Sequence, residues 1–256
     1  MKSKALPGLF QFLLPVSVGW SLAEVSRHES GEPFSQAGLG LLLSGIGAAY
    51  MLDTIADRRS DSQWVTGGLW LTFVFLASAL GWFLAGSQHD PGLLKIVCVL
   101  STLSLLYTRI KRIPFVKTLV VAFSWTWACS TLPFSPANRT LLAGSFTIPL
   151  LLLLSAGCIL CDLKDQIEDH QRRIPTLPVI LGAKPACLIA AGLATMAAAC
   201  ALIHHQWEIG AGAVLIAGVA QFPTRLSIKP WGAMLVDSLL AMPGICIALG
   251  HRFAAS

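Results

Sequence analysis

The chain has 256 residues, of which 55% are hydrophobic and only 12% are charged, about half of the ~25% charged residues typical of soluble domains. A soluble domain of this length cannot bury that much apolar surface, and a disordered low-complexity chain contains far less of it. Apolar runs longer than the ~18 residues of a membrane span instead indicate an all-α, polytopic integral membrane protein.

The formal net charge of +5 does not indicate a nucleic-acid partner, because the basic residues are spread over short segments between apolar runs. The seven cysteines fall inside or at the ends of those runs, where they are expected as small hydrophobic side chains.

The apolar runs predict nine transmembrane helices in one bundle with a central cavity, forming a single domain over residues 1–256. The second and sixth helices are expected to continue beyond the membrane, through Asp61 and Asp169. The nine expected ranges are Leu6–Val25, Phe34–Leu52, Trp64–Gly86, Gly92–Tyr107, Phe115–Phe134, Leu141–Cys161, Pro185–His204, Ile209–Phe222 and Trp231–Leu249.

The lysines and arginines predict the orientation of the chain. Of the 18 lysines and arginines, only four lie on the expected outer face of the membrane: Arg27, Lys95, Arg139 and Arg252. By the positive-inside rule the amino end is cytoplasmic and the carboxyl end lies outside, in a plasma (inner) membrane. The remaining 14 of the 18 lie at the amino end and after the even-numbered helices: Lys2, Lys4, Arg58, Arg59, Arg109, Lys111, Arg112, Lys117, Lys164, Arg172, Arg173, Lys184, Arg225 and Lys229.

The acidic residues gather in two cytoplasmic clusters. On continuous helices Asp53, Asp57 and Asp61 form one stripe at i, i+4, i+8, and Asp162, Asp165 and Asp169 form another at i, i+3, i+7. Like charges at these spacings repel each other unless a cation lies between them. The clusters hold seven of the thirteen acids: Asp53, Asp57 and Asp61, then Asp162, Asp165, Glu168 and Asp169.

Carboxylate oxygens favour a hard cation, and Mg²⁺ commonly shares its ligands with substrate phosphates. Lys111, Arg112 and Arg172 lie on the same face, so metal, carboxylates and basic residues together describe a diphosphate site. The alternative is a pair of solvated helix ends whose charges balance. Two clusters on one membrane face favour the diphosphate site.

The segment from Cys161 to Asp169, followed by Thr176-Leu-Pro-Val-Ile-Leu-Gly182, resembles the second aspartate-rich motif of the UbiA superfamily of intramembrane prenyltransferases, DxxDxxxD followed by TLPV-x-LG. The segment Tyr107–Arg112 is similar to the YxxxKR segment of that family. Tyr50-Met-Leu-Asp53-Thr-Ile-Ala-Asp57 resembles the end of its first motif, NDxxDxxxD.

The chain also departs from the family pattern. Ala49 and Tyr50 stand where the family has Asn-Asp, so one oxygen donor to the metal is missing. Pro175 replaces the basic residue usually found before TLP, and Arg172 and Arg173 lie slightly earlier. These changes are expected to weaken metal binding and to leave the fold unchanged.

The resemblance implies transfer of a prenyl group from an isoprenoid diphosphate to an aromatic or other lipophilic acceptor, within the membrane and among its lipids. Mg²⁺ is the implied cofactor, with Lys111, Arg112 and Arg172 contacting the diphosphate. Tyr107 and Thr108 would donate hydrogen bonds to it. The implied metal ligands are Asp53, Asp57, Asp162, Asp165 and Asp169.

Asp237 is the one acid well inside an expected span, and an ionisable residue in that position points to function. It would orient the acceptor or take its proton; the alternative is a buried carboxyl hydrogen-bonded to a Ser, Thr or Tyr of a neighbouring helix.

Two other functions of the protein stay open: a terpene cyclase that needs no acceptor, and a non-catalytic lipid-binding or carrier protein.

Overall fold

The computed structural model describes residues 5–57, 62–110, 113–135, 147–228 and 231–254 of the chain. Within these ranges the chain forms helices and turns and no strand. The longer helices are α1 (Ala5–Ser30), α2 (Gln36–Asp57), α3 (Ser62–Ser87), α4 (Gly92–Ile110), α5 (Val116–Thr131), α6 (Thr147–Asp162), α9 (Ala183–Ile203), α10 (Trp207–Val219) and α12 (Trp231–Ala254).

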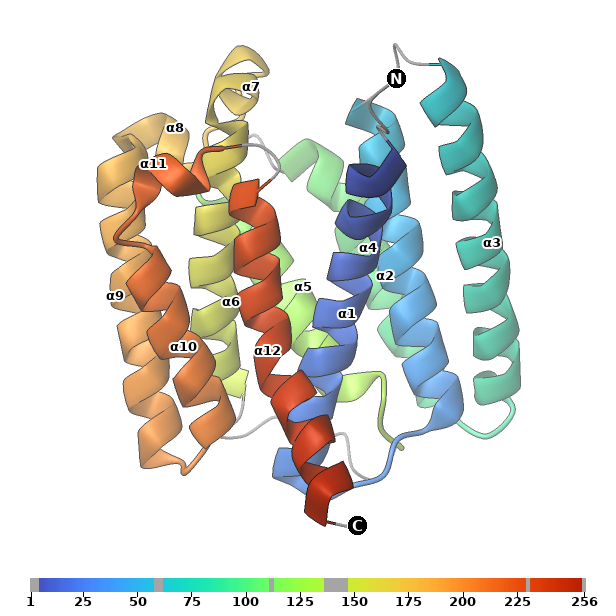
Figure 1. Cartoon of the computed structure of the whole chain (residues 1–256). Coiled ribbons are helices and arrows are strands. Elements are labelled where there is room, and N and C mark those ends of the chain that lie inside the picture. The colour runs from blue at the N-terminus through green and yellow to red at the C-terminus, as the bar shows by residue number, and fades with distance from the viewer. Residues whose placement is uncertain (1–4, 58–61, 111–112, 136–146, 229–230, 255–256) are drawn as a thin grey trace.

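These longer helices run alternately up and down the bundle, as Figure 1 shows. The short helices α7 (Gln166–Gln171), α8 (Leu177–Leu181) and α11 (Pro223–Leu226) gather at one end of it. The ends of α2 and α6, which carry the two acidic motifs, lie at this same end (Figure 1).

Three helical segments of the described residues are long and apolar enough to cross a membrane: Gly68–Ser87, Ala183–Ile203 and Trp231–Gly250. Shorter apolar helices include Gln36–Leu52, Gly92–Leu103 and Trp207–Val219. The all-helical class expected from the sequence is confirmed. The number of nine spans, the central cavity and the orientation in the membrane stay predictions.

Helix α6 forms the centre of the bundle, where it contacts α5, α9, α10 and α12. Its partner α9 presents a row of fully buried alanines: Ala186, Ala190, Ala194, Ala197 and Ala201. Small residues at this spacing let two helices approach closely, as is typical of membrane bundles. The side chains of α6 that are buried in this core include Leu150, Leu153, Ala156, Ile159 and Leu160.

Helix α3 lies at the edge of the bundle (Figure 1) and carries large apolar side chains on its outer surface. So many exposed apolar groups on one helix indicate an apolar surrounding rather than water. The surface is therefore that of a membrane protein. The exposed residues of α3 include Leu69, Trp70, Phe73, Leu76, Leu80 and Leu84.

The sixth helix was expected to continue through Asp169, but in the structure it is interrupted before that residue. Helix α6 ends at Asp162, a 3₁₀ turn covers Leu163–Asp165, and α7 begins only at Gln166. The tighter turn rotates the chain relative to a continuous α-helix. The regular stripe of Asp162, Asp165 and Asp169 is therefore broken.

Candidate functional site

The site begins at the start of α5, where the chain turns sharply into the helix. Phe115 precedes the helix with φ 65°, a left-handed conformation that costs a residue with a side chain about 1–2 kcal/mol. Two residues later, Lys117 lies in the first turn of α5. A cation there faces the positive end of the helix dipole, so this position needs negative partners.

Lys117 finds those partners in the second acidic motif. Its Nζ atom lies 2.8 Å from Oδ1 of Asp162 and 3.0 Å from Oδ2 of Asp169. The three side chains are only 19%, 10% and 7% exposed. One ammonium thus joins the end of α6 to α7, in a largely buried place where charge pairs interact strongly.

The other carboxylate oxygen of Asp162 has no such partner. Oδ2 is buried and accepts no hydrogen bond from the residues that the structure describes. A buried carboxylate oxygen is costly to leave unpaired. Carboxylate oxygens are the donors that a hard cation prefers, so a cation bound at Asp162 would satisfy this oxygen.

Asp165 points to a different neighbour. Its Oδ2 atom lies 3.7 Å from Nζ of Lys164, and both side chains are partly exposed. Burial of Lys164 opposes its charged form, but the negative charges around it, led by Asp165, hold the pKa of Lys164 above its ordinary value. Lys164 therefore stays protonated at the edge of the cluster.

Asp237 of α12 is joined to the same region. The thiol of Cys161 donates a hydrogen bond to Oδ1 of Asp237 over 3.8 Å, and Asp237 also interacts electrostatically with Lys164. The expected alternative partner, a hydroxyl of a neighbouring helix, is here a thiol. Asp237 thus lies beside the residue that directly precedes Asp162.

The structure describes only some of the remaining predicted site residues. Tyr107, near the end of α4, interacts electrostatically with Lys117 and so belongs to the cluster. Arg172 follows α7 as an exposed residue. The side chains of Asp53, Asp57 and Thr108, and residues Asp61, Lys111 and Arg112 altogether, lie outside the described residues.

The TLPVILG segment shapes the turn between α7 and α9. Thr176 precedes α8 in an extended conformation, and Pro178 occupies the first turn of that helix, where a missing N–H costs nothing. Gly182 then joins α8 to α9 with φ 89°, a conformation that favours glycine. The side-chain amide of Gln166 donates to the carbonyl of Pro178 over 2.7 Å, which fastens α7 to this turn.

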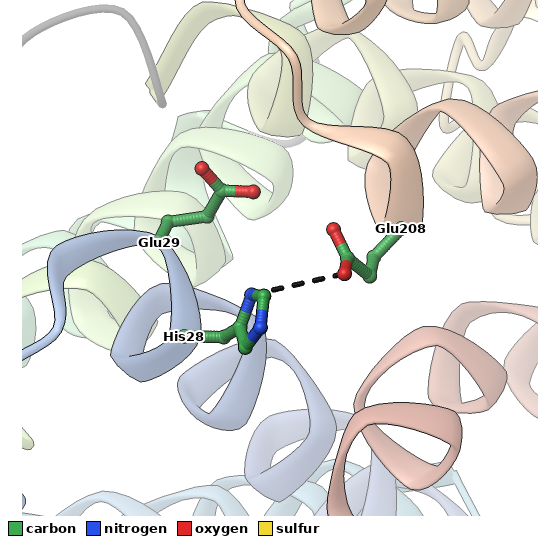
Figure 2. A group of neighbouring side chains, drawn as sticks. All are labelled: His28, Glu29 and Glu208. Atoms are coloured by element: carbon green, nitrogen blue, oxygen red, sulfur yellow. Dashed lines mark ion pairs between the residues drawn. The ribbon is translucent and has the colours of Figure 1, made fainter. Parts of the chain in front are cut away.

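A second group of ionisable side chains lies where α1 ends and α10 begins, at the other end of the bundle (Figures 1 and 2). One ligand atom each of His28, Glu29 and Glu208 lies within 4.8 Å of the others, and Nδ1 of His28 is 3.7 Å from Oε1 of Glu208. Burial raises the pKa of Glu29 to about 7, and the charge of Glu208 adds to the shift.

The described residues thus define a helical membrane bundle with carboxylates and one buried ammonium at one end. Residues 12–229 match the model of the UbiA prenyltransferase family, and the chain belongs to this family. The resemblance inferred from the motifs is therefore confirmed. Members of the family transfer prenyl groups within the membrane and generally use a divalent metal.

The fold is similar to the apo structure of a UbiA homolog from Aeropyrum pernix K1, with a TM-score of 0.64 and 16% sequence identity. The match covers 91% of this chain and 98% of that one. At this identity the likeness establishes the fold alone. No curated protein shows a significant match.

Sequence reasoning assigned no role to Lys117 beyond its place in the basic face of the membrane protein. It also overlooked the group around Glu29, whose members come from helices far apart in the chain. A weak signal existed for Lys117, because it is a lysine inside the expected apolar range Phe115–Phe134, and charged residues inside spans are usually functional.

Proposed function

We propose that this protein transfers a prenyl group from an isoprenoid diphosphate to an aromatic or other lipophilic acceptor, with Mg²⁺ as cofactor. The observation that carries the proposal is the buried cluster around Asp162, whose Oδ2 oxygen accepts no hydrogen bond from the described residues. The confirmed family gives the general class of reaction. Mg²⁺, the acceptor and the site residues belong to the proposal.

In this proposal Asp53, Asp57, Asp162, Asp165 and Asp169 hold the metal, directly or through water. When bound, Mg²⁺ supplies Lewis-acid polarisation of the diphosphate oxygens. Two acids of the second motif, Asp162 and Asp169, lie beside Lys117. The first motif contributes from the end of α2, at the same end of the bundle (Figure 1).

Basic and hydrogen-bonding residues would hold the diphosphate as it leaves. Lys111, Arg112 and Arg172 would contact its oxygens, and Tyr107 and Thr108 would donate hydrogen bonds. Loss of diphosphate from an allylic carbon separates charge, so fixed positive groups aimed at the leaving oxygens lower the barrier.

The prenyl cation that remains needs surroundings without a stray nucleophile. Apolar helix walls would exclude water from it, and lipids of the plasma membrane would give the prenyl tail access. Asp237 would orient the acceptor or take its proton, because it lies beside the second motif through Cys161. The cytoplasmic placement of the amino end is part of this proposal.

The test is a product analysis with purified protein in nanodiscs. Labelled geranyl, farnesyl and geranylgeranyl diphosphates are supplied with Mg²⁺ or with a chelator, each with and without aromatic acceptors. We expect prenylated acceptor and Mg²⁺-dependent diphosphate release. Hydrocarbon or alcohol formed without an acceptor would instead identify a terpene cyclase. Tight binding without any diphosphate release would identify a carrier.

A further inference from the structure

We propose that the ammonium group of Lys117 is a built-in cation of the second acidic motif, which competes with a divalent ion for the carboxylates of Asp162 and Asp169 and so weakens Mg²⁺ binding. This inference rests on the proposed function, because it concerns the same acidic residues. It goes further by naming a residue of this chain that lowers the affinity of the site for Mg²⁺.

The geometry around Lys117 is that of an ion held by its ligands. One nitrogen contacts two carboxylates that belong to separate helices, at 2.8 and 3.0 Å. Both carboxylates are nearly buried, so water does little to screen them. Without a positive charge at this place the two acids would repel each other strongly.

The local backbone brings Lys117 to this place against two unfavourable effects. Phe115 holds a left-handed conformation just before α5, and Lys117 lies at the helix end that repels cations. Such features persist where surrounding interactions compensate for them. The pairs with Asp162 and Asp169 are the interactions that do so.

The first acidic motif also departs from the family pattern in a way that is expected to weaken metal binding. Ala49 stands one helical turn before Asp53 and offers no oxygen donor. The chain therefore combines a first motif without an oxygen donor at position 49 with a second motif that is paired with the positive charge of Lys117. Both features are expected to lower the affinity of the site for divalent cations. The pair with Lys117 uses Oδ1 of Asp162 and leaves its Oδ2 available as an acceptor.

Two other roles for Lys117 make different predictions. A lysine that only fastens α5 to α6, with the ion bound away from Asp162 and Asp169, would change stability when removed and leave metal affinity nearly unchanged. A lysine that serves only as a ligand of the diphosphate would change substrate binding alone. Of these three roles, only competition with the metal for Asp162 and Asp169 predicts that removal of Lys117 tightens metal binding.

The experiment measures Mg²⁺ binding without any isoprenoid diphosphate, by calorimetry and by the Mg²⁺-dependent rise in melting temperature. Wild type is compared with Lys117→Met and with the matched control Lys184→Met, an exposed lysine at the start of α9. We expect Lys117→Met to bind Mg²⁺ at least ~10-fold more tightly, because a unit charge a few ångströms away outweighs the free energy of one decade in affinity. The control should bind like wild type.

A second pair of variants covers the case in which Lys117→Met does not fold. Asp169→Asn and the double variant Asp169→Asn/Lys117→Met differ only in the lysine, and the double variant loses one charge of each sign. We expect the double variant to bind Mg²⁺ more tightly than Asp169→Asn does.

Equal or weaker Mg²⁺ binding after removal of Lys117, in either background, would overturn this inference while the metal site of the proposed function stands. An absence of any Mg²⁺ effect in wild type and in all variants would overturn that metal site and this inference together. Weaker binding of inorganic diphosphate by Lys117→Met, with unchanged Mg²⁺ affinity, would assign Lys117 to the substrate and overturn it too.

Discussion

Cys161 of α6 and Asp237 of α12 are joined by a hydrogen bond from the thiol to the carboxylate, over 3.8 Å. The bond links the apolar helix α12 to the residue directly before Asp162. The carboxyl group inside an expected membrane span is thereby a neighbour of the second acidic motif, although the two are separated by several helices in the chain.

This position gives a prediction for Asp237→Asn. The amide keeps the shape of the carboxyl group but is a poor base, so transfer to the acceptor should fall by roughly 10²-fold or more. Acceptor-independent release of diphosphate should stay near the wild-type rate. The two rates are measured on one preparation, with Cys161→Ser as a control that keeps a donor for Asp237. Equal loss of both rates would exclude a role confined to the acceptor.

Asp162 and Asp165 should respond differently to replacement by alanine. Asp165→Ala is expected to abolish diphosphate release with little change in melting temperature, because this side chain is 30% exposed and its lysine partner is 3.7 Å away. Asp162→Ala removes one of two buried partners of Lys117, so we expect it also to cost about 1–3 kcal/mol of stability. Rates and melting curves of both variants test this. Wild-type release by Asp165→Ala would remove it from the site.

Ala49→Asn should lower the Mg²⁺ concentration that gives half-maximal activity. Ala49 is exposed on α2, one turn before Asp53, and side chains four residues apart share a helix face. Asparagine there would add one oxygen ligand for an ion that favours near-octahedral coordination. The measurement is a metal titration at saturating isoprenoid diphosphate. Coinciding curves would mean that position 49 does not face the ion.

The stability of the protein should depend on pH through Glu29. Its pKa rises on folding from 4.5 to about 7, first because of burial and then because of Glu208. Between these two pH values the folded protein therefore keeps a proton that the unfolded chain has lost. The stability that depends on protonated Glu29 is fully present below pH 4.5 and is lost as the pH rises through about 7.

Glu29→Gln should remove this part of the pH dependence. The melting temperature of the variant should fall less than that of wild type between these two pH values. Glu32→Gln, in the loop that follows α1, is the matched control and should retain the wild-type slope. Parallel curves for wild type and Glu29→Gln would contradict the prediction.

Gly182→Ala should destabilise the turn between α8 and α9. No atom lies within 4 Å of the added methyl group, so the effect comes from φ 89° alone, and we expect a loss of about 1–2 kcal/mol. Gly192→Ala, inside α9 and also without a close neighbour, should be neutral or stabilising, by up to about 1 kcal/mol. Thermal unfolding of both variants measures the difference.

Much of the helical layout was predictable because it depends on local composition. The expected range Pro185–His204 is found as Ala183–Ile203, and Gly92–Tyr107 as Gly92–Ile110. Long apolar runs must pair their backbone groups internally in a membrane, which makes them helices whatever their neighbours.

The sequence by itself therefore determined the helical class, the family and the acidic motif at the end of α6. Only the tertiary structure decided that α6 ends at Asp162, that Lys117 pairs with Asp162 and Asp169, and that Asp237 meets Cys161. Helical periodicity assigns a residue to a face of its own helix. Ion pairs between helices depend on how those helices pack and rotate against one another, which no local pattern encodes.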